Sequence, residues 1–220
     1  MEVVVPFAAE TPKTRLGDVL TSSERSTFAR AMLADVLAAI DETGHEPTVL
    51  STATLPFEDE LASVPPSASV AVDTRSLTDA VDARLPDEGD DPVAVVMADL
   101  ALATPDALEA LFATDADVAI APGRGGGTNA LVVDHPEFRV DYHGMSYLDH
   151  RAIAREAGAS LAAVDSFRLG TDVDEPEDLV EVLVHGTGRS PARLREFGFR
   201  LADESGRVGV VRDGESTLES

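Results

Sequence analysis

The chain contains no cysteine and no tryptophan, and Lys13 is the only lysine among its 17 basic residues. The absence of cysteine excludes disulfides, thiolate zinc sites and cysteine nucleophiles, which is typical of intracellular proteins. The sequence also lacks a run of about 18 apolar residues, the length that a membrane-spanning helix needs. Its first residues lack the basic leader of a secretory signal. We therefore expect a cytoplasmic protein that neither crosses nor binds a membrane.

Basic residues are few compared with acidic ones: 17 Lys and Arg stand against 41 Asp and Glu, for a formal net charge of −24. This composition is typical of halophilic proteins, because at roughly 1 M salt the Debye length falls to about 3 Å and an acidic surface then repels itself little. No segment gathers enough Lys and Arg to bind a phosphate backbone, which argues against nucleic acid as a partner. A small anionic substrate would need a local device: a metal ion, backbone N–H groups, or Lys13 and Arg15 acting together.

The lone lysine lies in a Pro-Lys-Thr-Arg-Leu segment, a few residues after the opening apolar run Val3–Val5. Lysine differs from arginine in carrying a compact charge on a flexible stem, which can follow a small anionic group. A chain that has otherwise discarded lysine is therefore expected to keep Lys13 to hold a phosphate. The alternative is a remaining surface lysine without a role.

Short Val-rich runs alternate with helical patterns along the chain, and their nearly continuous apolar character predicts strands buried on both faces. The predicted strands are Glu2–Phe7, Thr48–Ser51, Ser69–Val72, Val93–Ala98, Val118–Ala121, Ala130–Val133 and Ala163–Phe167. A capping box at 21–24, Thr104 before a proline, and Pro176 mark helix starts. The 220 residues therefore predict one α/β domain, a mainly parallel open sheet with helices on both faces, with a C-terminal helix and hairpin as an appendage at about 190–213.

Acidic residues follow two of the predicted strands, where an open α/β sheet binds its ligands. Asp99 ends the strand Val93–Ala98, and the Asp172-Val173-Asp174 spacing places two carboxylates on one side of an extended segment. Three such carboxylates suit a magnesium ion that bridges substrate phosphates. The alternative is that each aspartate only caps the helix that follows it.

A glycine-rich loop, Gly123-Arg124-Gly125-Gly126-Gly127, precedes the strand at 130–133. Consecutive glycines let the backbone pass close to a ligand and direct N–H groups at it. The loop is neither a Walker phosphate loop, because no Gly-Lys-Ser/Thr follows, nor a Rossmann fingerprint, because the glycines precede a strand. A flexible surface hairpin is the alternative.

Taken in order, these segments resemble the family of 2-phospho-L-lactate guanylyltransferases of the haloarchaeal type. The resemblance covers about residues 1–185 and rests on the segments Pro-Lys-Thr-Arg-Leu, Met-Leu-Ala-Asp-Val at 32–36, Asp99-Leu100, Gly-Gly-Thr-Asn-Ala-Leu at 126–131, Tyr142 with Ser146 and His150, and Asp-Val-Asp-x-Pro-Glu-Asp-Leu at 172–179. It implies a nucleotidyltransferase with the GT-A-like sheet of nucleotide-diphospho-sugar transferases. The implied reaction joins GTP to 2-phospho-L-lactate, giving lactyl-2-diphospho-5′-guanosine and pyrophosphate on the route to coenzyme F-420.

Carried over residue by residue, the resemblance implies three groups of site residues. The implied magnesium ligands are Asp99, Asp172 and Asp174. The implied catalytic residues are Lys13, Arg15 and Asp99, of which the two basic ones would steady the triphosphate and the leaving pyrophosphate. The residues implied to hold the three-carbon acid are Thr128, Gly144 and Ser146. Such a reaction depends on alignment and charge neutralisation, so it demands no acid–base histidine.

The sequence departs from the family pattern in two places. The family has glycine directly after the aromatic residue, whereas here His143 follows Tyr142 and Gly144 comes next, which leaves the backbone donor open. The family segment Leu-Asn-x-Ala, expected near the base, reads Leu-Thr-Asp-Ala at 77–80. Guanine specificity therefore rests on the resemblance alone. His150, on a predicted helix, is interpreted as structural.

Three function classes are weighed. The first is guanylyl transfer to 2-phospholactate or to a relative such as phosphoenolpyruvate. The second is nucleotidyl transfer to a molybdopterin cofactor or a sugar phosphate, although the glycine-rich start of molybdopterin guanylyltransferases is absent. The third is a non-catalytic nucleotide-binding or scaffold protein. The segment Phe199–Val211 predicts a hairpin around Ser205-Gly206 that is either structural or the contact of a homodimer.

Overall fold

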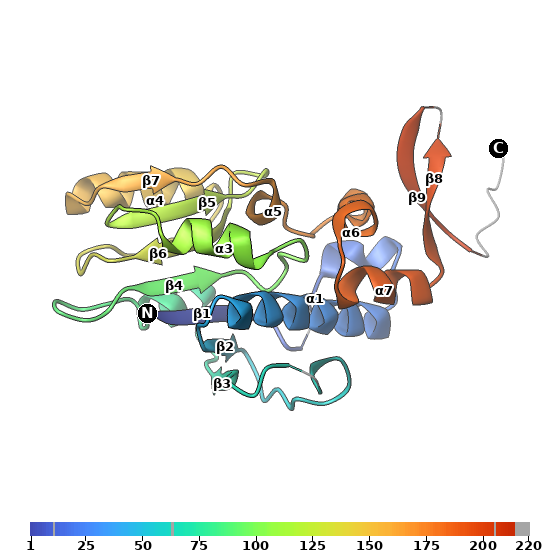
Figure 1. Ribbon diagram of the computed structural model, residues 1–220, viewed down its shortest axis with the longest axis horizontal. Helices are drawn as coiled ribbons and strands as arrows, with labels where there is room; N and C mark the ends of the chain where they lie inside the picture. The colour runs from blue at the N-terminus through green and yellow to red at the C-terminus, as the bar shows by residue number, and fades with distance from the viewer. Residues whose placement is uncertain (11, 63, 205, 214–220) are drawn as a thin grey trace.

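The computed structural model describes residues 1–10, 12–62, 64–204 and 206–213. Within these residues, seven strands form one sheet in the order β3-β2-β1-β4-β6-β5-β7 (Figure 1). All neighbours pair in parallel except β6, which runs antiparallel to both β4 and β5. The strands of this sheet are β1 (Glu2–Phe7), β2 (Pro47–Ser51), β3 (Ser69–Val72), β4 (Val93–Val96), β5 (Val118–Pro122), β6 (Thr128–Val133) and β7 (Leu161–Ala163). The predicted mainly parallel sheet is confirmed.

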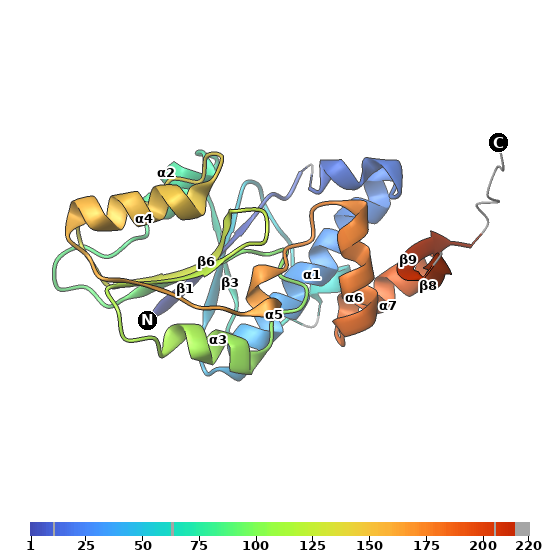
Figure 2. The ribbon, with the colours of Figure 1, turned by 90° about the horizontal axis from the view of Figure 1, so that it is seen from above.

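Helices cover both faces of this sheet, as predicted. Figure 2 shows α1 and α3 on one side of the strands, and α2 and α4 on the other. The helices of the described chain are α1 (Ser22–Glu42), α2 (Leu77–Asp82), α3 (Pro105–Phe112), α4 (Ser146–Ala157), α5 (Phe167–Gly170), α6 (Leu179–His185) and α7 (Arg189–Glu196). Three short 3-10 turns add η1 (Thr14–Asp18), η2 (Asp59–Leu61) and η3 (Pro176–Asp178).

The hydrophobic core has two parts, one on each face of the sheet, because the side chains of each strand alternate between the two faces. In β1, Val3 and Val5 pack in the cluster that includes α1 and α3, whereas Val4 packs in the cluster that includes α2. All three valines are fully buried. Burial on both faces explains why the central strands read as continuous apolar runs in the sequence.

Two predicted elements differ from the structure. The last predicted strand, Ala163–Phe167, is wrong in position: β7 covers Leu161–Ala163, and the chain turns into helix α5 where the Ser166 hydroxyl accepts a hydrogen bond from the Leu169 N–H. The helix predicted from Pro176 begins instead as the 3-10 turn η3, and α6 follows it. The capping box of α1 is present, with reciprocal bonds between Thr21 and Glu24.

The C-terminal strands β8 (Phe199–Glu204) and β9 (Arg207–Arg212) form a separate antiparallel hairpin that projects from the body beyond α6 and α7 (Figure 1). Ser205, where the sequence predicted the turn, lies outside the described residues. Arg212 anchors the hairpin because it pairs with Glu24 and donates to the Val19 carbonyl at 3.0 Å. None of the helices in the described ranges is long and apolar enough to span a membrane.

Candidate active site

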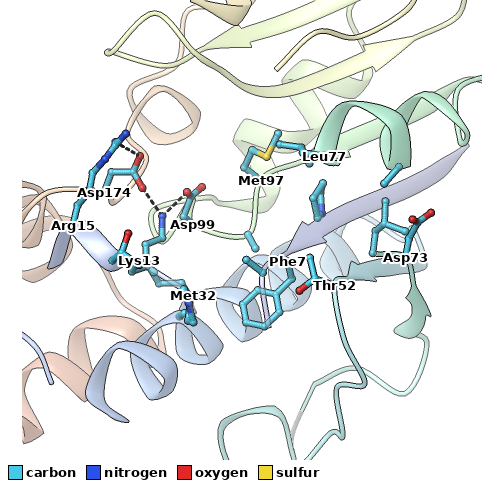
Figure 3. A pocket seen from close by; sticks show the side chains of 18 of the residues that line it. Phe7, Lys13, Arg15, Met32, Thr52, Asp73, Leu77, Met97, Asp99 and Asp174 are labelled. Atoms are coloured by element: carbon cyan, nitrogen blue, oxygen red, sulfur yellow. Dashed lines mark hydrogen bonds and ion pairs between the residues drawn. The ribbon is translucent and has the colours of Figure 1, made fainter. Parts of the chain in front are cut away.

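A cavity of about 470 Å³ lies along the carboxyl ends of β1, β2, β3 and β4 (Figure 3). Each of these strands contributes a lining residue at or just after its end: Phe7, Thr52, Asp73 and Met97, respectively. Parallel strands bring their carboxyl ends to one edge of the sheet, and ligands of open α/β folds gather there. The topology therefore gathers side chains from the ends of four strands around one hollow.

Lys13 lies at one end of this cavity, between two carboxylates. Its ammonium nitrogen Nζ is 2.6 Å from Oδ2 of Asp99 and 2.7 Å from Oδ1 of Asp174 (Figure 3). The lysine side chain is only 12% exposed. Burial lowers the pKa of Lys13, but the charges and hydrogen bonds of Asp99 and Asp174 raise it above its ordinary value, so the group is charged. The structure thus places the lone lysine between two of the strand-end acids, and its predicted role of holding a phosphate stays a prediction.

The backbone itself brings the two acidic segments together. The Val173 N–H donates to the Asp99 carbonyl at 3.3 Å, which joins the end of β4 to the Asp-Val-Asp segment. Val173 is fully buried in the core, so the aspartates on either side of it turn toward the sheet edge. The Asp178 carboxylate accepts the N–H groups of Asp174 and Glu175 and holds the following turn. The segment therefore both caps η3 and supplies the cavity with Asp174.

Asp172 lies beside this cluster but makes a different contact. The Asn129 side-chain amide donates to Asp172 Oδ1 at 3.1 Å and to the Leu169 carbonyl at 2.9 Å. Burial raises the pKa of the Asp172 carboxyl, and the negative charges of Asp99 and Asp174 raise it further, whereas the bond from Asn129 lowers it. Asn129 was not predicted as a site residue, although it follows Thr128 in the glycine-rich motif. Its role is visible only when the loop and the acidic segment are seen together.

The glycine-rich loop joins β5 to β6 as a hairpin, and one of its glycines is required by close packing. A Cβ atom at Gly123 would lie 2.4 Å from Oδ1 of Asn129. A larger residue at Gly123 would therefore push away the amide that holds Asp172. The loop thus acts on the acidic cluster through Asn129.

Two of the predicted acid-binding residues lie together at the start of β6 and α4. The Thr128 N–H donates to the Ser146 hydroxyl at 2.9 Å, and the Thr128 hydroxyl is 2.9 Å from Nδ1 of His150. The Asp141 N–H donates to His150 Nε2 at 2.9 Å, so the proton of the neutral ring is assigned to Nδ1. Burial lowers the pKa of His150 to about 4. This histidine orients Thr128, in agreement with its structural interpretation.

The remaining predicted residues are more exposed. Gly144 lies on the surface with φ of +62°, two residues before α4. His143, which replaces the family glycine, points outward and pairs with Asp141. Arg15 is 65% exposed and has Nη1 at 3.3 Å from Asp174 Oδ2. The cavity is lined by Lys13, Arg15, Asp99 and Asp174, and its lining does not include Asp172, Thr128, Gly144 or Ser146.

The acidic residues do not form a finished metal site. Among the residues that the structure describes, no group of three or more His, Cys, Asp and Glu side chains is arranged to hold a metal ion. The Lys13 ammonium instead supplies the positive charge between Asp99 and Asp174. Asp99 Oδ1 is buried and accepts no hydrogen bond from the described chain, although a buried carboxylate oxygen normally has a partner. The magnesium triad stays a prediction, and this oxygen is where a cation would find a ligand.

The far end of the cavity was not predicted from the sequence. It is lined by Thr52 and Asp73, which follow β2 and β3, and by Arg75 and Leu77 at the start of α2. The strand-end rule that identified Asp99 applies equally to Asp73, which directly follows the predicted strand Ser69–Val72. The signal was therefore present in the sequence.

Comparison with known proteins connects this geometry to a family. The model of the family described as "Guanylyl transferase CofC like" matches residues 1–212. A curated protein of Haloterrigena turkmenica named 2-phospho-L-lactate guanylyltransferase is 70% identical, over 98% of this chain and 99% of its own. A protein of the same name from Methanosphaerula palustris is 48% identical, over 95% of this chain and 96% of its own.

Solved structures agree on the fold. A structure from Desulfovibrio desulfuricans, described as a nucleotide-diphospho-sugar transferase, has a TM-score of 0.68 at 19% identity, and the match covers 89% of this chain and 95% of that one. A nucleotidyl transferase from Methanothermobacter has a TM-score of 0.54 at 15% identity, with 89% and 98% covered. At such low identity these structures show the predicted nucleotidyltransferase fold alone.

Proposed function

Because the chain belongs to the family of CofC-like guanylyl transferases, we propose that it transfers the guanylyl group of GTP to 2-phospho-L-lactate. A phosphate oxygen of the acid attacks the α-phosphorus of GTP, the bond from that phosphorus to the β-phosphate oxygen breaks, and pyrophosphate leaves. The products are lactyl-2-diphospho-5′-guanosine and pyrophosphate, an intermediate and by-product of coenzyme F-420 synthesis. The observation that carries the proposal is the Lys13–Asp99–Asp174 cluster at one end of a nucleotide-sized cavity.

Lys13 and Arg15 are proposed to bind the triphosphate. Both line the cavity beside the strand-end acids, and both bring positive charge into a chain whose net charge is −24. If a triphosphate enters this end of the cavity, its oxygens become new partners of the buried Lys13 ammonium. Charge on the leaving pyrophosphate is then neutralised where it develops, which is the main means of catalysis in phosphoryl and nucleotidyl transfer.

Magnesium is proposed as the cofactor, with Asp99, Asp172 and Asp174 as the ligands. The donors fit, because hard divalent cations bind carboxylate oxygens and Asp99 Oδ1 is buried without a partner in the described chain. When bound, the ion would supply positive charge that offsets the negative charge of the phosphates. Asn129 positions Asp172 for this role by its bond at 3.1 Å.

The three-carbon acid is proposed to bind beside Thr128, Ser146 and Gly144. Thr128 is adjacent in sequence to Asn129, which contacts Asp172, and its N–H donates to the Ser146 hydroxyl, so both residues belong to the segment beside Asp172 although neither lines the cavity. The left-handed backbone at Gly144 exposes N–H groups before α4, where anions are favoured by the helix dipole. Phosphoenolpyruvate has the same phosphate and carboxylate and remains the competing acceptor.

The composition and the hairpin support two further parts of the proposal. The acidic surface suits a saline cytoplasm, in keeping with the relatives from salt-loving organisms such as Haloferax volcanii. The hairpin β8–β9 exposes Leu201 and Val208 by 40% and 58%, respectively, and an isolated two-stranded hairpin is marginal in water. We propose that it forms the contact of a homodimer. Light scattering of the full chain and of Leu201→Asp should show a dimer and a monomer, respectively.

The function is tested by pyrophosphate release at high salt, with magnesium and GTP, and with 2-phospho-L-lactate, phosphoenolpyruvate or a sugar 1-phosphate offered in parallel. Release with a three-carbon phospho-acid is the expected result and identifies the acceptor. Release with the sugar phosphate alone would contradict the acceptor while keeping the chemistry. Absence of release with every acceptor would contradict the proposed reaction.

Asp174→Asn tests the acidic cluster directly. We expect turnover to fall by at least about a hundredfold, because one carboxylate beside the reacting phosphates is lost, while the fold persists because Asp174 lies outside the core. Steady-state kinetics and circular dichroism measure the two effects. Glu177→Gln, a neutral substitution on the same turn outside the cavity lining, is the matched control. Equal activity of Asp174→Asn and wild type would remove Asp174 from the site.

A further inference from the structure

Asp73 lies at the end of the cavity away from Lys13 (Figure 3). It forms an ion pair with Arg75, which also lines the cavity. Asp73 directly follows β3, and its N–H donates to the Ser51 carbonyl at 2.9 Å, which fixes the residue to the end of β2. The Asp73 side chain is 15% exposed and that of Arg75 is 51% exposed. Nothing in the proposed transfer chemistry uses this pair.

Arg75 holds the Asp73 carboxylate in one orientation. The Arg75 backbone N–H and side-chain Nε each donate to Oδ1 at 3.0 Å, and Nη2 donates to Oδ2. These hydrogen bonds hold the pKa of Asp73 at about 2, so the carboxyl is ionised. A carboxylate has about four acceptor positions, so three N–H groups leave acceptor capacity. The guanidinium likewise keeps N–H groups beyond those that it directs at Asp73.

The separation of the two cavity ends matches a nucleotide. Asp73 follows β3 and Asp99 follows β4, and β2 and β1 lie between these strands in the sheet. At about 4.8 Å between neighbouring strands, the two strand ends are about 14 Å apart. A nucleotide whose phosphates lie at Lys13 would therefore reach the Asp73 end with its base. Leu50, Leu77 and Ala80 line the cavity near that end and offer apolar contacts to a planar ring.

We propose that Asp73 and Arg75 recognise the edge of guanine and so select GTP. The inference deepens the proposed function and rests on it for the position of the phosphates. Guanine offers an acceptor, its 6-oxo group, beside two donors, its N1–H and 2-amino groups. The ion pair offers the complement: N–H groups of Arg75 for the 6-oxo group, and the Asp73 carboxylate for the donors.

Adenine fits this pair badly at both positions. Its 6-amino donors would face the Arg75 donors, and its N1 lone pair would face the Asp73 carboxylate. A site built to hydrogen-bond a group rejects a ligand that lacks it, because the buried polar groups of the site are left unpaired. Discrimination against ATP therefore follows from the ion pair without any hydrogen bond from the Leu-Thr-Asp-Ala segment at 77–80.

The test measures nucleotide binding by calorimetry at high salt, without an acceptor. Four nucleotides are compared: GTP, ATP, ITP and XTP. ITP lacks the 2-amino group of guanine, and XTP carries an oxo group in its place. Wild type should bind GTP at least about tenfold more tightly than ITP or ATP. In Asp73→Asn the GTP-to-ITP ratio should fall to within about threefold. In the same variant the affinity for XTP relative to GTP should rise by about tenfold, because the asparagine amide donates to the 2-oxo group.

The gain on XTP keeps the test informative, because a misfolded variant would lose all four nucleotides. Asp213→Asn is the matched control, since it neutralises another Arg-paired carboxylate, that of Asp213 with Arg200 in the hairpin region. This control should keep the wild-type ratios. Unchanged ratios in Asp73→Asn, with binding retained, would overturn the inference and reduce the pair to a turn that follows β3.

The binding ratios also separate this inference from the proposed function. If wild type binds GTP selectively but releases no pyrophosphate with any acceptor, the transfer reaction fails while the Asp73 assignment stands. If pyrophosphate is released and Asp73→Asn discriminates as wild type does, the reaction stands and the assignment fails. Loss of binding to all nucleotides in a folded Asp73→Asn protein would also contradict base recognition by hydrogen-bond pattern.

Discussion

Lys13 combines an unusual composition with an unusual backbone. It is the only lysine of the chain, and its φ of +54° lies in the left-handed region, which non-glycine residues rarely adopt. Such a conformation costs of the order of 1 kcal/mol or more and persists where the surroundings impose it. At Lys13 the carbonyl accepts the Leu16 N–H at 3.0 Å at the start of η1, and the side chain contacts two carboxylates at the cavity end.

Lys13→Arg should lower kcat/KM by at least about tenfold although the charge is conserved. The Lys13 side chain is only 12% exposed, and its ammonium approaches two carboxylates at 2.6 and 2.7 Å. A planar guanidinium cannot take the position of this compact group. Pyrophosphate release measures the loss. Arg15→Lys, at a position that is 65% exposed, is the comparison and should be milder. Full activity of Lys13→Arg would show that only the charge of this residue matters.

His150 is the buried titratable group with a consequence for stability. Its ring is fully buried, bonded to Thr128 and to the Asp141 N–H, and packs edge-on against Tyr142 at 5.2 Å between ring centroids. Protonation would turn Nε2 from an acceptor into a donor facing that N–H. The folded protein therefore prefers the neutral ring.

The stability of the fold should consequently fall as the pH drops from about 6.5 to 4. Burial holds the folded pKa of His150 at about 4, below the ordinary value of 6.5, so the unfolded chain binds more protons between these values. The difference corresponds to about 3 kcal/mol, present in full above pH 6.5 and lost by pH 4. Urea unfolding of wild type and His150→Gln across this range measures it. Parallel pH curves for both proteins would contradict the assignment.

One carboxylate of α1 binds the start of α7. Asp35 of α1 accepts the N–H groups of Arg189 and Ser190 at 2.7 and 2.8 Å, and also the Ser190 hydroxyl. It thus caps the N-terminus of α7 from another helix. Gly188 is required there, because a Cβ atom would lie 2.3 Å from Asp35 Oδ1. The Met-Leu-Ala-Asp-Val motif that supported the family resemblance therefore includes a structural residue.

Asp35→Ala should destabilise the protein by about 1–3 kcal/mol, because it leaves N–H groups at the start of α7 without their partner in a place that is 11% exposed. Urea unfolding measures the change. Asp41→Ala on the same helix removes an exposed carboxylate that accepts only from Ser67 in the described chain and should change stability by about 0.5 kcal/mol or less. Equal effects of the two substitutions would show that the cap contributes nothing specific.

The molecule as a whole carries far more negative than positive charge, and within the described residues several of its positive groups pair with acids. Arg193 pairs with Glu60 and Glu196, Arg212 with Glu24, and Arg84 with Glu2. These pairs neutralise only a part of the 41 acidic residues. The remainder repel one another unless salt screens them.

Thermal unfolding should therefore depend strongly on salt. Raising KCl from 0.1 to 2 M is expected to raise the Tm by about 5 °C or more, because the Debye length falls from about 10 Å to below 3 Å and the repulsion within the folded state is screened. Calorimetry in the presence of a chelator excludes a contribution from divalent ions. A Tm that is the same at both salt concentrations would contradict self-repulsion as the limiting term.

Local pattern was sufficient for most of the fold. The apolar runs located β1, β2, β4, β5 and β6, because strands buried on both faces must be apolar throughout, and the capping residues located α1 and α3. The edge strand β3 was also located, although it is partly exposed. The failures lie where tertiary contacts outweigh pattern. β7 pairs through only three residues with β5, too few to impose a signal, and the start of α6 becomes a 3-10 turn because Asp178 closes it from within.

The sequence by itself determined the fold class of the protein, its strongly acidic net charge, its family, and Lys13, Asp99 and Asp174 as candidate site residues. Only the tertiary structure decided how those residues act together. It placed the Lys13 ammonium between Asp99 and Asp174, bonded Asp172 to Asn129, and brought Asp73 into the same cavity from another strand. The physical reason is that residues 161 positions apart, as Lys13 and Asp174 are, meet only through the order and register of the strands. Spacing along the chain does not encode that order.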